Sequence, residues 1–154
     1  MSIKPAAAQI TTVCVTLDQD EALTLSDRII VMRGGEIEQT DAPEALYDKP
    51  TTRFVAKFSG EANILEDGDT IECGIPHKSG SAAMIRPERI RIAAPGAPTC
   101  YDADQHQSIA GTVDDRIYAG PLRKYRVRVG NNVLMVREHV VSGRPIFRPG
   151  DEAA

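Results

Sequence analysis

The spacing of apolar positions changes near residue 60, and this change separates two kinds of predicted structure. Residues 10–17 read ITTVCVTL, an almost continuous apolar and β-branched run that is typical of a strand buried on both faces, as in a parallel sheet. Residues 18–27 begin with acidic side chains, which favour the first turn of a helix. The pattern therefore predicts a strand followed by a helix.

A hairpin and two short helices are predicted next. Residues 28–32 and 36–40 flank Gly34-Gly35, a combination that predicts two strands joined by a tight turn. Asp41, followed by Ala42-Pro43, predicts an N-cap and the start of a helix that runs to Tyr47. The stripe of Phe54, Val55 and Phe58 predicts a second helix over residues 52–58.

Short apolar runs separated by Gly, Pro and Asp follow residue 60, and this spacing is typical of a small all-β barrel or sandwich. The clearest alternation spans residues 123–129, and residues 95–107 are expected to form an exposed loop. We therefore predict an α+β chain with an α/β fragment at residues 1–60 and a β domain at residues 61–154. The runs expected to form strands are 62–65, 70–73, 82–86, 89–92, 108–118, 123–129 and 133–138.

Composition narrows the function classes. The chain has 154 residues, 42% hydrophobic and 26% charged, with a net charge of −4, so it is expected to bury a core and not to bind nucleic acid. Residues 107–154 nevertheless carry 8 basic and 5 acidic side chains. The chain contains no apolar run of membrane-spanning length, no signal peptide is recognised, and any membrane contact is expected to go through a protein partner.

Cysteine and histidine give no indication of a metal site. Cys14, Cys73 and Cys100 are widely spaced, which favours reduced cytosolic thiols over a disulfide framework or a zinc site. The histidines have no partner at helical spacing, so solvated surface positions are favoured over metal binding. They are His77, His106 and His139. We predict neither a metal site nor a catalytic constellation from the sequence.

Motifs in the first part of the chain occur in a recognisable order. They are Asp-Gln-x-Glu-Ala at 18–22, Ser-Asp-Arg-Ile at 26–29, Gly-x-Ile-x-Gln at 35–39, Pro-x-x-x-Tyr at 43–47 and Phe-Val-Ala at 54–56. This series resembles the end of the ATPase domain of ABC importers, most closely in the branch that energises uptake of polyamines, ferric iron, sulfate or sugars. Pro50, Gly60 and Asn63 extend the match.

The later part resembles the transport-associated OB module, called TOBE, that follows the ATPase domain in this branch. The similarity rests on residues 85–88, 111–113, 118–120 and 125–127, and on residues 148–151 as the lead-in to the last strand. It implies a small OB-like all-β barrel at residues 61–154. Because the chain stops at Ala154, the final strand of the barrel is expected to be missing.

The chain departs from the family at the positions that handle ATP. It contains no G-x-x-x-x-G-K-[ST] loop for phosphates, no LSGGQ-type signature loop and no strand-borne Asp-Glu pair for magnesium. The resemblance places the family's switch histidine, which senses the γ-phosphate, at Leu17, and leucine has no donor or acceptor for that role. We therefore expect no ATP hydrolysis and no cofactor, whereas the intact family uses ATP and magnesium.

The basic strand near residue 125 leaves two interpretations open. Its charges favour an edge strand that is protected against aggregation, or they form a face that binds anions or docks a partner, as OB-type barrels do. The scarcity of aromatic side chains argues against single-stranded nucleic acid. The docking and ligand candidates are Arg86, Glu88, Arg116, Tyr118, Arg123, Lys124, Arg126 and Arg128.

Two functions follow from these expectations. The first is a non-catalytic, regulatory portion of an ABC importer ATP-binding protein, cytoplasmic and peripheral to the inner membrane. Its partners would be permease subunits and a second ATPase subunit. The second is a stand-alone OB-type module that binds a small anion or a polyamine. Because strand 10–17 would expose its apolar faces without sheet neighbours, self-association is also expected.

Overall fold

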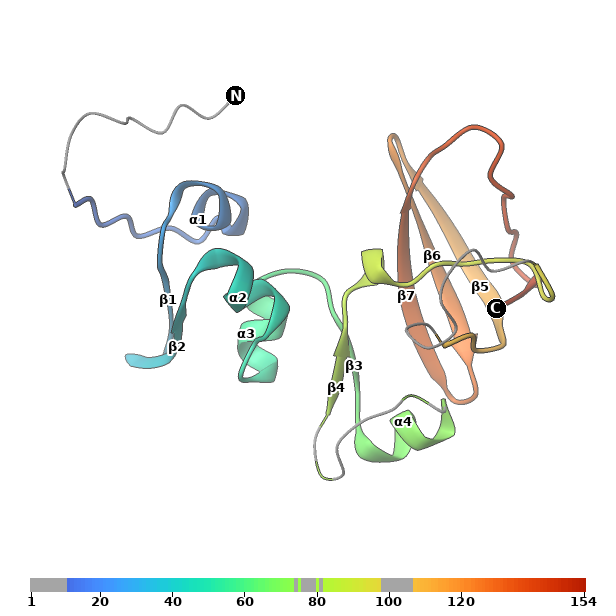
Figure 1. The fold of residues 1–154 in the computed structure, drawn as a ribbon, viewed down its shortest axis with the longest axis horizontal. Helices are drawn as coiled ribbons and strands as arrows, with labels where there is room; N and C mark the ends of the chain where they lie inside the picture. Colours follow the sequence, from blue (N-terminus) through green and yellow to red (C-terminus); the bar gives the residue numbers. More distant parts are fainter. Residues whose placement is uncertain (1–10, 74, 76–79, 81, 98–106) are drawn as a thin grey trace. The chain divides into compact units, whose positions relative to one another are not determined.

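The computed structural model describes residues 11–73, 75, 80, 82–97 and 107–154. The chain divides into two compact units. Figure 1 shows their elements. The amino-terminal unit, residues 1–59, contains α1 (Gln19–Leu25), β1 (Ile29–Arg33), β2 (Glu36–Asp41), α2 (Pro43–Asp48) and α3 (Arg53–Phe58). The carboxyl-terminal unit, residues 60–154, contains β3 (Asn63–Leu65), α4 (Asp67–Glu72), β4 (Ala83–Ile85), the 3-10 turn η1 (Pro87–Arg89), β5 (Gly111–Ala119), β6 (Leu122–Val129), β7 (Asn132–His139) and β8 (Glu152–Ala153).

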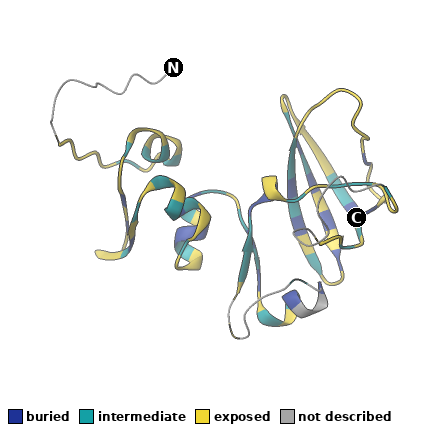
Figure 2. Cartoon of the chain, in the orientation of Figure 1, coloured by how far each residue is buried: buried dark blue, intermediate teal, exposed yellow. Residues whose placement is uncertain are grey.

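The predicted hairpin is confirmed as β1 paired antiparallel with β2. Ile29 and Val31 point to one face of the hairpin, where they pack with Leu46 of α2 and Val55 of α3 in a small core. The alternate positions of β1 are exposed, as Figure 2 shows by colour. Because side chains of β1 alternate between the two faces of the hairpin, one face packs against the helices α2 and α3 and the other face is exposed.

A buried glutamine fixes the loop between α2 and α3. The Gln39 side chain accepts hydrogen bonds from the backbone N–H and the hydroxyl of Thr51 and donates to the Lys49 carbonyl. It also donates to the Asp41 carboxylate at 3.0 Å. The predicted N-cap role of Asp41 is therefore wrong: Asp41 ends β2, and Ala42 is the N-cap of α2 without a side-chain hydrogen bond.

The predicted strand at residues 10–17 is also wrong in its described part, because residues 11–17 form no strand. Val13, Val15 and Leu17 are 86%, 96% and 92% exposed. A strand buried on both faces needs neighbours on either side, and the described part of the amino-terminal unit supplies none. The helix that follows is confirmed, since Asp18 caps α1 by accepting from the N–H groups of Asp20 and Glu21.

A curled antiparallel sheet in the order β7-β6-β5-β8 dominates the carboxyl-terminal unit. Its inner face carries alternate residues of the strands, and a loop returns over it so that the Phe147 ring meets the Tyr125 ring edge-on at 6.1 Å between centroids. The buried core of this unit consists of Leu65, Cys73, Val113, Tyr125, Val127, Val129, Leu134, Val136, Phe147 and Ala153.

Two of the expected strands have other conformations. Residues 70–73 were predicted as a strand, but residues 67–72 form α4, whose first turn holds Asp67 and Asp69, and the Asp69 carboxylate accepts from the Glu66 N–H. Carboxylates favour a helix N-terminus, and here they outweigh the β-branched residues. The strand predicted at 89–92 is also wrong: Arg89 ends η1, which begins at Pro87, and residues 90–92 belong to no helix or strand.

Residues 152–153, at the place where the last strand was expected to be cut off, form β8, which is two residues long and pairs with β5. Ala93 lies on its other side and exchanges two backbone hydrogen bonds with Ala154, at 2.9 and 3.0 Å. The remaining strand predictions are confirmed as β3, β4, β5, β6 and β7 within a few residues. The expected loop at 95–107 lies mostly outside the described residues.

Gly111 is the first residue of β5 and lies close to β6. A Cβ at this position would lie 2.8 Å from both the Arg128 carbonyl oxygen and the Val127 Cγ1, too close for either neighbour to remain in place. We expect Gly111→Ala to lower the free energy of unfolding by about 1–3 kcal/mol, measured by urea denaturation. Gly68→Ala is the matched control: its Cβ meets nothing within 4 Å, and alanine favours the α4 helix. Equal stability of the two variants would contradict the close approach at Gly111.

Candidate docking face of the carboxyl-terminal sheet

The basic residues of β6 divide between the two faces of the sheet. Lys124, Arg126 and Arg128 lie on the outer face, whereas Arg123 lies on the inner face with Tyr125, Val127 and Val129. β6 itself is flanked by β7 and β5. The interpretation of this strand as a charged edge is therefore wrong, because the edges of the sheet are β7 and β8.

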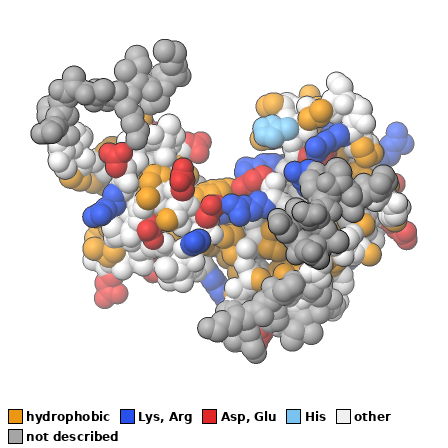
Figure 3. Space-filling view, in the orientation of Figure 1, with side chains coloured by type: hydrophobic (Ala, Val, Ile, Leu, Met, Phe, Trp, Pro, Cys, Tyr) orange, Lys and Arg blue, Asp and Glu red, His pale blue; other side chains and the backbone are white. Residues whose placement is uncertain are grey.

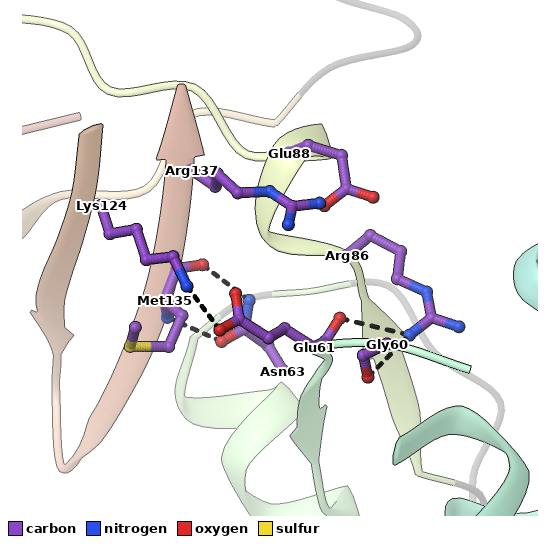
Figure 4. A network of polar contacts seen from close by, with 8 residues as sticks. All are labelled: Gly60, Glu61, Asn63, Arg86, Glu88, Lys124, Met135 and Arg137. Atoms are coloured by element: carbon purple, nitrogen blue, oxygen red, sulfur yellow. Dashed lines mark hydrogen bonds and ion pairs between the residues drawn. The ribbon is translucent and has the colours of Figure 1, made fainter. Parts of the chain in front are cut away.

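Two ion pairs bring acidic residues onto the outer face. Lys124 of β6 and Arg137 of β7 are cross-strand neighbours, so their like charges would repel. The Lys124 ammonium lies 2.6 Å from the Glu61 carboxylate, and the Arg137 guanidinium lies 2.7 Å from the Glu88 carboxylate. Figure 4 shows these side chains together. The segment before the sheet thus neutralises both cations.

Asn63 connects the same segment to the edge of the sheet. Its side-chain amide donates to the Met135 carbonyl at 2.8 Å, and its side-chain oxygen accepts from the Met135 N–H at 2.7 Å. The Asn63 side chain thus offers Met135 one donor and one acceptor, as the backbone N–H and C=O groups of a neighbouring strand would. Asn63 is 6% exposed, so the two hydrogen bonds are shielded from water. We call Glu61, Asn63, Glu88, Lys124 and Arg137, with the Met135 backbone, the clasp.

Arg86 stabilises the backbone next to the clasp. Its side chain is 1% exposed, and Nη1 donates to the carbonyl oxygens of Gly60 and Glu61 at 3.3 and 3.2 Å. Gly60 has φ of 148°, a conformation that favours glycine. Arg86 therefore holds the backbone that positions the Glu61 carboxylate, and its guanidinium points toward the carbonyl oxygens of Gly60 and Glu61 (Figure 4).

The other candidates are not members of the clasp. Arg128 is bidentate to Asp114, with contacts of 2.9–3.1 Å. Arg126 is exposed and has no side-chain partner among the described residues. Arg116 and Tyr118, both exposed, lie near the turn between β5 and β6, and Tyr118 is 69% exposed. These two residues face the same side of the sheet as Tyr125 and Arg123.

Arg123 belongs to an internal network. It is 6% exposed and its guanidinium lies 2.9 Å from the Glu138 carboxylate and 3.4 Å from the Tyr125 hydroxyl. The hydrogen bond with Tyr125 and the neighbouring Glu138 carboxylate together raise the pKa of Arg123 above its ordinary value, although burial acts in the opposite direction. Its position on the inner face makes Arg123 a structural cation.

The described part of the outer face carries charged side chains of both signs. Figure 3 shows Lys and Arg side chains interspersed with Asp and Glu on the side of the molecule in view. The described residues contain no group of three His, Cys, Asp or Glu side chains that could hold a metal ion. His139 is exposed at the end of β7, while His77, His106 and Cys100 lie outside the described residues. Cys14 is exposed and Cys73 buried, both as free thiols.

Sequence reasoning found the cations but missed most of their partners. No ion pair was predicted for Glu61, Asp114 or Arg137. Asn63 was recognised only because it matches the family's sequence pattern. The pairs join residues 14 to 72 positions apart in the chain, so local spacing gives no signal for them. The only sequence signal for the hydrogen-bonding role of Asn63 was its place as a polar residue at the start of a short apolar strand.

Comparison with known proteins defines the class of this fold and site. Residues 83–154 match the family model of the TOBE domain, so this part of the chain is a TOBE domain. The homologues are ATP-binding proteins of ABC importers, and the match is to their carboxyl-terminal part. No helix in the described ranges is both long and apolar enough to cross a membrane.

The relatives include importers of different solutes. The chain is 38% identical to an Fe(3+) ions import ATP-binding protein of Rhizobium etli over 85% of this chain and 39% of the relative. It is 36% identical to a spermidine/putrescine import ATP-binding protein of Pseudomonas fluorescens, over 92% and 44%. A further Fe(3+) ions import ATP-binding protein, from Agrobacterium fabrum, is 38% identical over 84% and 39%. The chain thus spans about two fifths of the length of these relatives.

The variant Asn63→Asp tests the clasp. The introduced carboxylate keeps the acceptor for the Met135 N–H but loses the donor and faces the Met135 carbonyl, so we expect a loss of about 1–3 kcal/mol at neutral pH. Burial would raise the pKa of this carboxyl above that of the unfolded chain. The protonated acid restores the donor, so the stability gap from the parent protein should be smallest below the unfolded pKa and widen as pH rises through the folded pKa.

Urea denaturation from pH 4 to 8, with parent and variant compared at each pH, measures this gap. Asn132→Asp is the matched control, because the Asn132 amide makes only a 4.0 Å contact with the Cys73 sulfur. A gap that is independent of pH for Asn63→Asp, or an equal gap for Asn132→Asp, would contradict the paired hydrogen bonds.

Proposed function

We propose that this chain is the non-catalytic carboxyl-terminal portion of an ABC importer ATP-binding protein and acts as its regulatory and docking module. The observation that carries the proposal is that homology to such proteins extends over 84–92% of the chain, across both units. The relatives are import proteins for Fe(3+) ions and for spermidine/putrescine, so the solute is proposed to be of the ferric or polyamine class.

The geometry supports a rigid binding surface in the TOBE domain. Asn63, Glu61 and Glu88 fasten the segment at the start of the domain to the outer face of the sheet. The domain thereby keeps one arrangement of charges, which suits recognition of a partner subunit because fixed complementary charges favour specificity. We propose permease subunits and a second ATP-binding subunit as partners. We also propose that the carboxyl-terminal sheet closes as an OB-like barrel and that the protein is located in the cytoplasm at the inner membrane.

The alternative is a stand-alone module that binds a small anion or a polyamine. Arg126, exposed and without a side-chain partner among the described residues, favours anion binding. Lys124, Arg128 and Arg137 already pair with carboxylates, which gives this alternative less support. A thermal-shift panel of molybdate, sulfate, phosphate, spermidine and putrescine tests it, and no shift with any of them would exclude it.

The chain by itself should neither bind nor hydrolyse ATP, because it lacks a phosphate-binding loop and carries Leu17 where the family has its switch histidine. We expect no heat of binding for Mg-ATP in isothermal titration calorimetry. Leu17→His should also show no ATP hydrolysis in a phosphate-release assay, since one histidine cannot replace the missing loop. Turnover by either protein would contradict the proposal.

A chimera tests the proposed role within an importer. The carboxyl-terminal part of the Pseudomonas fluorescens spermidine/putrescine relative is replaced by residues 11–154 of this chain, with and without Leu17→His, and spermidine uptake is measured in cells that lack the relative. We expect uptake only with Leu17→His, because the chimera then has both the phosphate-binding loop and the switch histidine. A relative without its carboxyl-terminal part is the negative control. Absence of uptake from a folded Leu17→His chimera would oppose the proposed role.

A further inference from the structure

We draw no further inference here: the strongest candidate, the exposed pair of Arg116 and Tyr118 on the side of the carboxyl-terminal sheet that carries Arg123, belongs to the small-anion alternative already described, and nothing in the structure shows what covers it.

Discussion

The two hydrogen bonds between the Asn63 amide and the Met135 backbone close the edge of the sheet at β7. An open edge presents unpaired N–H and C=O groups that attract further strands, and each hydrogen bond that satisfies them contributes about 0.5–1.5 kcal/mol. The opposite edge, β8, is closed by the backbone of Ala93. Asn63 at one edge and Ala93 beside the other thus each satisfy the backbone groups of one residue at the borders of the four-stranded sheet.

The charges on the outer face depend on this closure. Glu61 precedes Asn63 by two residues, so the amide that caps β7 also brings the Glu61 carboxylate to Lys124, and Arg86 fixes the intervening backbone. The abundance of cations in β6 therefore does not translate into a strongly positive surface. The outer face carries a fixed pattern of paired charges together with the exposed Arg126, whereas Arg116 and Tyr118 lie on the side of the sheet that carries Tyr125 and Arg123. Exposed ion pairs contribute little stability, and their contribution here is to define that pattern.

Sequence predicted the elements whose signals are local and failed where neighbours decide the structure. The Gly34-Gly35 turn, the apolar stripe of Phe54, Val55 and Phe58 in α3 and the alternation in β6 were sufficient for their elements. The four residues at 70–73 have strand propensity, yet the acidic first turn of α4 decided their conformation. Residues 11–17 fit a buried strand in every local respect, but a strand forms only against another strand. Of the candidate site, the cations were predictable from composition, whereas the carboxylates that neutralise them join the sheet from distant positions.

The two units differ in how far their strand edges and sheet faces are covered. Both contain antiparallel strands with one face covered by packed side chains. In the carboxyl-terminal unit, Asn63 and Ala93 occupy the edges and the loop bearing Phe147 covers the inner face. In the amino-terminal unit, α2 and α3 cover one face of the hairpin, while its edges and the apolar side chains of Ile30, Met32 and Ile37 remain open. A two-stranded hairpin is marginally stable by itself, so the amino-terminal hairpin depends on the packing of α2 and α3 against β1. The carboxyl-terminal sheet is supported both on its inner face and at its edges.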